Sequence, residues 1–362
     1  MKKCDKWILY TFYILIAFGL LMIYSASSVV ALFNYNNEYY YVIKQAVYTI
    51  IGIILNIIII NSDISKIKKS SKIIFLFSIG LLILVLIPGI GIVRGGARSW
   101  IGFGNLTIQP SEVMKISMVI FLSKILSNLK DELLKFRNFL FLIIIIIGIF
   151  LLIMLQPDFG TGMVIVLSSF MLLFVSNTKI KYFIFLIIAG IVGIIFLIII
   201  APYRMERITA FLDPWSDPLG SGFQGIQSLF AIAPSGIFGL GFNKSIQKHI
   251  FLPEPQNDFI FAIICEELGL IGGIFTISCF LIIIIRSVRV ALLIKDLFKK
   301  YLVLGLTFVL FSQVFINIGV VIGLLPVTGI TLPFISVGGT SLLIAVLQVS
   351  IILNISKEVD NK

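Results

Sequence analysis

Long apolar runs alternate with short polar segments over nearly the whole chain. About 20 apolar residues in a helix cross the hydrocarbon core of a bilayer, so each run predicts one membrane-spanning helix. We predict an all-α polytopic membrane protein with a single domain over residues 1–362. The pattern indicates about ten transmembrane helices, at residues 7–31, 39–60, 73–92, 112–127, 138–155, 161–176, 180–200, 258–285, 301–323 and 340–356.

The composition agrees with this pattern and excludes several classes of function. Hydrophobic residues make up 59% of the 362 residues and charged residues only 12%, which exceeds the apolar content that a soluble core needs. The net charge of +11 does not indicate binding to nucleic acid, because no basic stripe with interleaved aromatic residues is present. Three cysteines without paired spacing and a single histidine indicate neither a disulfide framework nor a multi-histidine metal site.

The distribution of basic residues predicts how the chain is oriented. Most of the 28 Lys and Arg residues lie in the loops on the same side as the N-terminus, and few lie in the loops on the other side. Short loops rich in Lys and Arg remain in the cytoplasm. We therefore expect a multi-pass protein of the cytoplasmic (plasma) membrane with both termini in the cytoplasm.

Four connections on the opposite side are rich in Gly and Pro: residues 93–112, 156–162, 201–257 and 323–341. The third of these is one large extracytoplasmic loop between the seventh and eighth helices. Irregular backbone near membrane depth is tolerated where it lines a cavity inside the protein. We therefore predict one outward-facing cavity that is built from these four segments.

Two carboxylates lie at the start of the predicted eighth helix. Asp258 begins this helix, above a face of small residues: Ala262, Cys265 and Gly269. Its side chain either caps the helix or acts as a reactive group, and the pattern does not decide between the two. Glu254 lies between two prolines that stiffen its backbone, although a solvated loop acid fits the same pattern.

Further charged residues lie inside the helices or at their ends. At least one of Glu266 and Glu267, within the eighth helix, is expected to form a structural ion pair. Glu112 and Lys115 are three residues apart at the start of the fourth helix. They form a local ion pair, or Lys115 binds a phosphate or carboxylate group, and both interpretations remain open. Asp158, in the turn QPDFGTG, is expected to bond to local backbone.

Cations are available on the same side as these acids. Arg98 and Trp100 lie among glycines, which suits an anionic group beside a stacking surface, although Trp100 also fits an interfacial anchor. The long loop adds Arg204, Arg207, Lys244 and Lys248. Cations suit a lipid-linked phosphate, and a neighbouring carboxylate suits a general base. The residues alone leave two functions open: group transfer onto a lipid-linked sugar, and transport of a polar or anionic substrate.

Several long motifs narrow this choice. The chain resembles, in order along nearly its whole length, the SEDS family, which comprises the FtsW, RodA and SpoVE proteins. The motifs are RGGARSWI, LTIQPSEVMK, QPDFGTG, IQSLFAI, LPEPQNDFIFAIICEELGLIGG, INIGVVIGLLPVTGITLPFISVGGTSLL and LNIS. The resemblance implies a ten-helix peptidoglycan glycosyltransferase that polymerises lipid II. It also implies a class B penicillin-binding protein as partner, together with other divisome or elongasome membrane proteins.

The resemblance also implies roles for individual residues. Asp258 matches the family's essential aspartate, a general base that activates the acceptor hydroxyl of lipid II. Trp100, Glu112 and Lys115 match functional positions, and Asp158 matches a motif residue with a supporting role. Arg and Lys side chains would stabilise the leaving diphosphate, with a divalent cation, Mg²⁺ or Mn²⁺, left open. The motifs are nearer to FtsW and SpoVE than to RodA.

Two positions depart from the family pattern. The segment GFNKSIQKH has Ile246 where Arg is usual, and SVGGTS has Val337 where Tyr is frequent. If the usual Arg binds phosphate, Lys244 or Lys248 must replace it in this chain. Ile246 therefore keeps one alternative open, an inactive scaffold that recruits a penicillin-binding protein. The resemblance leaves a second alternative, a lipid II flippase, because this activity has been proposed for the family.

Overall fold

The computed structural model describes residues 4–94, 96–103, 106–176, 178–188, 190, 211–220, 222–249 and 251–359. Helices dominate this part of the chain. They are α1 (Lys6–Tyr35), α2 (Tyr40–Ile60), α3 (Ile64–Leu84), α4 (Pro110–Leu129), α5 (Phe136–Met154), α6 (Phe159–Val175), α9 (Phe223–Ile232), α10 (Ile260–Leu293), α11 (Leu297–Val321) and α12 (Gly339–Ser356). Two 3₁₀ turns, Lys130–Leu134 and Pro214–Ser216, and a helical stretch at residues 180–188 are also described.

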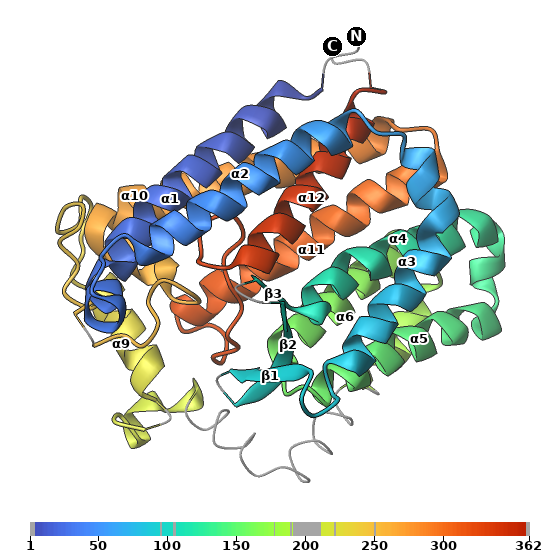
Figure 1. The fold of residues 1–362 in the computed structure, drawn as a ribbon. Coiled ribbons are helices and arrows are strands. Elements are labelled where there is room, and N and C mark those ends of the chain that lie inside the picture. Colours follow the sequence, from blue (N-terminus) through green and yellow to red (C-terminus); the bar gives the residue numbers. More distant parts are fainter. Residues whose placement is uncertain are drawn as a thin grey trace.

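The long helices form one bundle with two distinct ends (Figure 1). Both chain termini lie close together at one end of this bundle, and the small sheet and α9 lie at the other end. Six of the described helices are long and apolar enough to cross a bilayer: α1, α2, α5, α10, α11 and α12. The prediction of a helical, multi-spanning chain is therefore confirmed, and the irregular segments gather at one end as expected.

The predicted spans match the described helices with local shifts. Each predicted span apart from 180–200 overlaps one described helix. Residues 180–188 are helical, and most of the remainder of that seventh span lies outside the described residues. The number of ten spans therefore stays a prediction.

A three-stranded antiparallel sheet follows α3, and the all-α prediction missed it. Its strands are β1 (Gly91–Arg94), β2 (Ala97–Phe103) and β3 (Leu106–Ile108), in the order β1-β2-β3. The predicted third span was too long at its end, because Pro88 and Gly89, the latter with φ of +91°, follow soon after α3 ends. The sheet supplies the irregular outer segment with backbone hydrogen bonds, which a loop near membrane depth needs.

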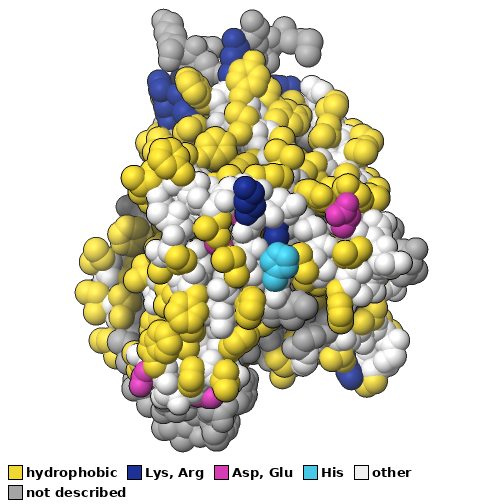
Figure 2. Space-filling view, turned by 90° about the vertical axis from the view of Figure 1, so that its left-hand side faces the viewer, with side chains coloured by type: hydrophobic (Ala, Val, Ile, Leu, Met, Phe, Trp, Pro, Cys, Tyr) yellow, Lys and Arg dark blue, Asp and Glu magenta, His cyan; other side chains and the backbone are white. Residues whose placement is uncertain are grey.

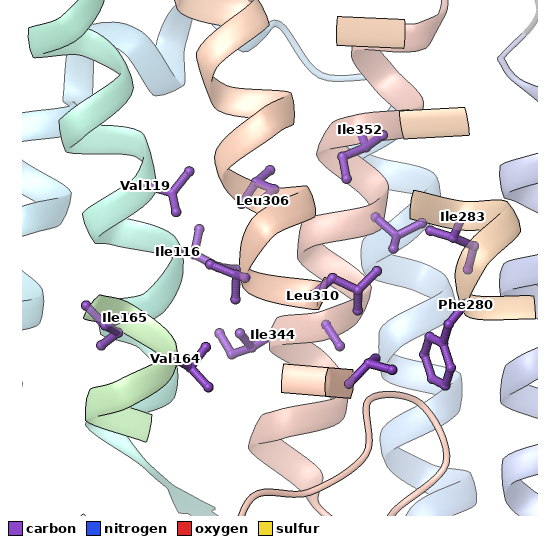
Figure 3. Packing of buried hydrophobic residues seen from close by; sticks show 14 of the residues in the cluster. Ile116, Val119, Val164, Ile165, Phe280, Ile283, Leu306, Leu310, Ile344 and Ile352 are labelled. Carbon is purple, nitrogen blue, oxygen red and sulfur yellow. The ribbon is translucent and has the colours of Figure 1, made fainter. Parts of the chain in front are cut away.

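Buried aliphatic and aromatic side chains hold the centre of the bundle together (Figure 3). Helices α11 and α12 are the most enclosed spans, each with 78% of its apolar window buried, whereas α2 has 28% buried. Side chains from five helices meet in this core: Ile116 and Val119 of α4, Val164 and Ile165 of α6, Phe280 and Ile283 of α10, Leu306 and Leu310 of α11, and Ile344 and Ile352 of α12. The outer helices are therefore left to face lipid, which costs apolar side chains nothing.

Helix α10 is interrupted at Gly269, whose φ is +66° and ψ −159°. The segment 236–241 bridges this break. The N–H groups of Leu240 and Gly241 donate to the carbonyl oxygens of Glu266 and Glu267, both at 2.9 Å. A Cβ on Gly269 would lie 2.3 Å from the carbonyl oxygen of Ile237, so only glycine fits. The break is thus a packed feature with its backbone groups satisfied.

Replacing Gly269 by Ala is expected to lower the free energy of unfolding by about 1–3 kcal/mol. The reasons are the left-handed backbone at this position and the overlap with Ile237. Thermal unfolding in detergent micelles measures the change. Gly80→Ala is the matched control, because a Cβ there meets nothing within 4 Å and Ala favours the helix. Equal stability of the two variants would contradict this account of the break.

Candidate active site

Asp258 lies just outside the membrane helices, two residues before α10 begins at Ile260. The helix-cap interpretation is wrong, because Phe259 occupies the N-cap position and no side chain caps this end. The Asp258 side chain is half-buried. Burial raises the pKa of its carboxyl to about 7, with a smaller increase from Glu254, while a hydrogen bond from its own backbone opposes the shift. Such a carboxyl exchanges a proton readily at neutral pH.

The backbone around Asp258 is anchored to the segment that follows α11. Asn317 of α11 donates from Nδ2 to the carbonyl oxygen of Asp258 at 2.8 Å. The N–H of Val337 donates to the carbonyl oxygen of Gln256 at 2.9 Å. Two of the four Gly- and Pro-rich segments therefore meet through their backbone just before Asp258.

Glu254 lies four residues before Asp258, on the exposed side of the same turn. Its backbone is left-handed, with φ of +47°, and its carboxylate accepts a hydrogen bond from Nδ2 of Asn257 at 2.7 Å. Its negative charge acts on Asp258, since it contributes to the raised pKa of that carboxyl. The structure thus brings together the two carboxylates predicted at this position.

The predicted pair of Glu112 and Lys115 is present and buried. Lys115 Nζ lies 2.8 Å from Glu112 Oε1 and donates to Oε1 of Gln313 at 2.9 Å. The second oxygen of Glu112 is also buried and has no hydrogen-bond partner within the described parts of the chain. An unsatisfied buried carboxylate oxygen is costly, so this end of the pair is suited to accept a donor from a ligand or water.

Lys248 does not lie free for an anionic ligand. Its Nζ is 3.1 Å from Glu267 Oε1, and the two side chains are 2% and 0% exposed. It also donates to Ser25 Oγ at 3.3 Å and to Asn243 Oδ1. The expected structural ion pair thus exists at Glu267, although its cation comes from a loop instead of another helix. Glu267 also accepts from the N–H of Ser245 at 3.1 Å, so it organises the loop that carries Lys248.

Glu266 supports the same loop from the neighbouring position. Its Oε1 accepts from the N–H groups of Ile246 at 2.8 Å and Gln247 at 3.2 Å, and its Oε2 accepts from the Ser245 hydroxyl. The Ile246 side chain is 58% exposed, so this departure from the family pattern changes no buried contact. The other departure, Val337, donates its backbone N–H to the carbonyl oxygen of Gln256, a bond that does not depend on the side chain.

The remaining predicted residues lie around this centre or outside the described residues. Arg98 and Trp100 are both on β2 and half-buried, and Arg98 Nη1 donates to the carbonyl oxygen of Leu86 at 3.4 Å. Asp158 caps α6 by accepting from the N–H of Thr161 at 3.2 Å. Its other oxygen accepts from two polar side chains at the start of α4, Gln109 and Ser111. Arg204 and Arg207 lie outside the described residues.

Sequence reasoning missed the polar face of α11. Gln313 and Asn317 are buried among apolar neighbours and contact both Lys115 and the backbone of Asp258. The signal was available, because two amide side chains four residues apart fall on one face of an otherwise apolar helix.

The charged groups of this centre are mostly buried. Figure 2 shows the side of the molecule that lies at the left of Figure 1, where hydrophobic side chains are widespread and charged ones are few. Among the residues that the structure describes, no three His, Cys, Asp or Glu side chains form a group that could hold a metal ion. The site combines the half-buried carboxyl of Asp258 with the buried Glu112–Lys115 pair, and both are bonded to α11. This arrangement suits proton transfer beside an anionic substrate.

Known proteins resemble this chain over almost its whole length. Stage V sporulation protein E of Bacillus subtilis is 46% identical over 345 residues, covering 95% of this chain and 94% of that protein. A protein named probable peptidoglycan glycosyltransferase FtsW, from Geobacter sp. (strain M18), is 39% identical over 344 residues, with coverage of 95% and 94%.

Solved structures show the same fold. One, described as "Structural coordination of polymerization and crosslinking by a peptidoglycan synthase complex", matches with a TM-score of 0.80 and 25% identity over 99% of both chains. The crystal structure of the rod shape determining protein RodA of Thermus thermophilus matches with a TM-score of 0.74 at 22% identity, over 99% of this chain and 98% of that one. A family model described as cell cycle protein, for FtsW, RodA and SpoVE, matches residues 5–361. The chain therefore belongs to the FtsW, RodA and SpoVE family of cell cycle proteins.

Proposed function

We propose that this protein is a peptidoglycan glycosyltransferase that polymerises lipid II into glycan strands at the outer face of the cytoplasmic membrane. Relatives that are 39% and 38% identical carry the name peptidoglycan glycosyltransferase FtsW, which supports the activity. The single structural observation that carries the proposal is Asp258: a half-buried carboxyl at the mouth of the bundle, with a pKa raised to about 7 by burial.

The chemistry assigned to Asp258 is general base catalysis. Its carboxylate takes the proton from the acceptor sugar hydroxyl of lipid II as the oxygen attacks the anomeric carbon of the growing strand. The bond from that carbon to the diphosphate breaks, and undecaprenyl diphosphate leaves with the electron pair. Each cycle thus extends the strand and releases one lipid diphosphate.

The other charged residues are proposed to bind and orient the substrate. Lys115 and Arg98 are the cations for the diphosphate, and Glu112 orients Lys115 through their 2.8 Å contact. Trp100, on β2 with Arg98, offers a stacking surface. Lys248 is assigned to structural support instead, because Glu267, Ser25 and Asn243 take all three of its ammonium donors. At Lys115, Glu112 and Gln313 take two of the three donors.

A divalent cation, Mg²⁺ or Mn²⁺, is proposed as an optional aid to departure of the diphosphate. Mg²⁺ usually keeps several waters and binds substrate phosphates, so the diphosphate itself would supply its main ligands. The cation would neutralise charge on the diphosphate when bound.

The membrane setting follows the charge distribution along the chain. We assign the end that carries the termini to the cytoplasm, because the Lys- and Arg-rich loops lie on that side. A class B penicillin-binding protein is the proposed partner, since the similar solved structure is described as coordinating polymerization and crosslinking. A transpeptidase at the outer end would receive the new strand as it forms.

The test is purified protein with its partner, given fluorescently labelled lipid II. Glycan strands are expected, resolved by gel electrophoresis. A flippase would move labelled lipid II across liposomes without elongating it, and a scaffold would do neither. Either of these results would overturn the proposed activity.

The rate of strand synthesis is expected to rise with pH through a midpoint near 7. Asp258 must be ionised to accept the proton, and its pKa is raised to about 7. Because Glu254 contributes to this increase, Glu254→Gln is expected to move the acidic limb to lower pH. Initial rates measured across neutral pH for both proteins check this. An acidic limb that Glu254→Gln leaves in place, or moves to higher pH, would refute the electrostatic coupling.

A further inference from the structure

Two buried amide side chains lie one turn apart on α11. Gln313 is 3% exposed and Asn317 is 1% exposed, and their spacing of four residues puts both on one face of the helix. Burying an amide is costly unless its polar atoms are bonded, and aliphatic residues would fill the same space without this cost. The bonds that these two amides make therefore indicate what they do.

Asn317 uses its amide nitrogen to join two chain segments. Nδ2 donates to the carbonyl oxygen of Asp258 at 2.8 Å and to that of Ile330 at 2.6 Å. The first carbonyl belongs to the proposed base itself, and the second lies in the Gly- and Pro-rich segment after α11. Both N–H donors of the amide are thus committed to holding backbone at the active site.

Gln313 makes the corresponding pair of contacts one turn away. Its Nε2 donates to the carbonyl oxygen of Thr331 at 3.1 Å, and its Oε1 accepts from Lys115 Nζ at 2.9 Å. Lys115 is in turn 2.8 Å from Glu112. The second amide thus ties the cation of the site to the same face of α11.

The two amides donate to consecutive carbonyl oxygens, those of Ile330 and Thr331. They thereby fix the position of that segment along α11. Through their other contacts they connect Asp258 and Lys115 to one rigid helix. Asp258 is therefore held through its backbone carbonyl, and Lys115 through its ammonium group, at points one helical turn apart on α11.

We propose that Asn317 and Gln313 are positioning residues that hold the Asp258 carboxylate and the Lys115 ammonium group in register for the reaction. This inference rests on the proposed function. Transfer to a sugar requires the base and the diphosphate-binding cation to act on one substrate pair at the same moment. A displacement of about 1 Å can cost about a hundredfold in rate, so a rigid connection between the two groups has catalytic value.

The chain offers a matched control for Asn317. Asn354 of α12 donates from Nδ2 to the carbonyl oxygens of Ile59, Ile60 and Ser62, at 2.7, 3.0 and 2.7 Å. These carbonyls lie where α2 ends, on the side of the bundle that carries the termini. Asn354 thus performs the same backbone bridging away from the site. Asn317→Leu and Asn354→Leu remove the same kind of bond at the two ends of the protein.

Both variants are expected to unfold at a lower temperature than wild type, by similar amounts. Only Asn317→Leu is expected to lower kcat for strand synthesis, by about a hundredfold, with KM changed little. It is also expected to move the acidic limb of the pH profile to lower pH, because a released Asp258 becomes better hydrated. Asn354→Leu should keep the wild-type kcat and pH profile at temperatures where it is folded.

Gln313→Met keeps the inference testable if Asn317→Leu does not fold. Met matches Gln in length and loses both polar contacts, so Lys115 is expected to shift and KM for lipid II to rise. If folded Asn317→Leu and Asn354→Leu show equal kcat and equal pH profiles, the inference is overturned. The same holds if Gln313→Met keeps the wild-type kcat and KM. Failure of the proposed function can be told apart from failure of this inference. In that case wild type would make no strands, or Asp258→Asn would make them normally.

Discussion

Asp258→Asn is expected to abolish strand synthesis, with kcat lowered by about 10² to 10⁴-fold. Asn has the same size as Asp but cannot accept a proton, so the change removes the base and leaves the packing around it. The carbonyl contact with Asn317 involves only the backbone and is retained. Single-turnover rates with labelled lipid II measure the chemical step directly, and substrate binding should remain near the wild-type level.

Glu254→Gln is the matched control for this loss. Glu254 lies four residues away in the same turn, is exposed, and accepts a hydrogen bond from Asn257. Removing its charge should shift the pH profile while leaving most of the activity at high pH. Strand synthesis by Asp258→Asn at the rate of Glu254→Gln would eliminate Asp258 as the base, even if wild type is a polymerase.

Lys248→Met is expected to lower the free energy of unfolding by about 3–5 kcal/mol. The change leaves Glu267 charged and buried without its cation, 3.1 Å away in the native protein. Glu267 would keep its bonds from Ser25 and from the backbone of Asn243 and Ser245, which limits the loss without replacing the charge. Thermal or denaturant unfolding in detergent micelles provides the measurement.

Lys299→Met provides the comparison, because Lys299 pairs with Glu358 where both side chains are 24% and 45% exposed. Water screens such a pair, so its loss should cost less than about 1 kcal/mol. Similar losses in the two variants would mean that the buried pair contributes no more than a surface pair. A large loss at Lys248 alone would also explain why that lysine is unsuited to bind a substrate phosphate.

Much of the candidate site was predictable because it depends on neighbours in sequence. The pairing of Glu112 with Lys115 follows from their spacing of three residues on one helix. Asp158 bonds to backbone three residues ahead, as expected of an acid in a turn before a helix. The amides of α11 could have been noticed in the sequence, but nothing there indicates which carbonyls they hold.

Other expectations changed once the structure was known. Lys248 was predicted to bind phosphate, yet its ammonium group lies 3.1 Å from Glu267, 19 residues further along the chain. The sheet after α3 was missed because its strands are short and are separated by glycines, so the segment resembles a loop in a membrane protein. In the sequence Asp258 fits a helix cap, but in the structure α10 begins two residues later.

The sequence by itself predicted the membrane-spanning helices, because a bilayer requires only helices that are long and apolar enough to cross it. The positions of the basic loops predicted the orientation. The sequence also determined the contacts made within one turn of a helix. Only the tertiary structure decided which polar groups meet. Lys115 and Gln313 are 198 residues apart, and the Asp258 carbonyl and Asn317 are 59 apart. Such pairs form because buried polar atoms must find partners once apolar packing has brought their helices together.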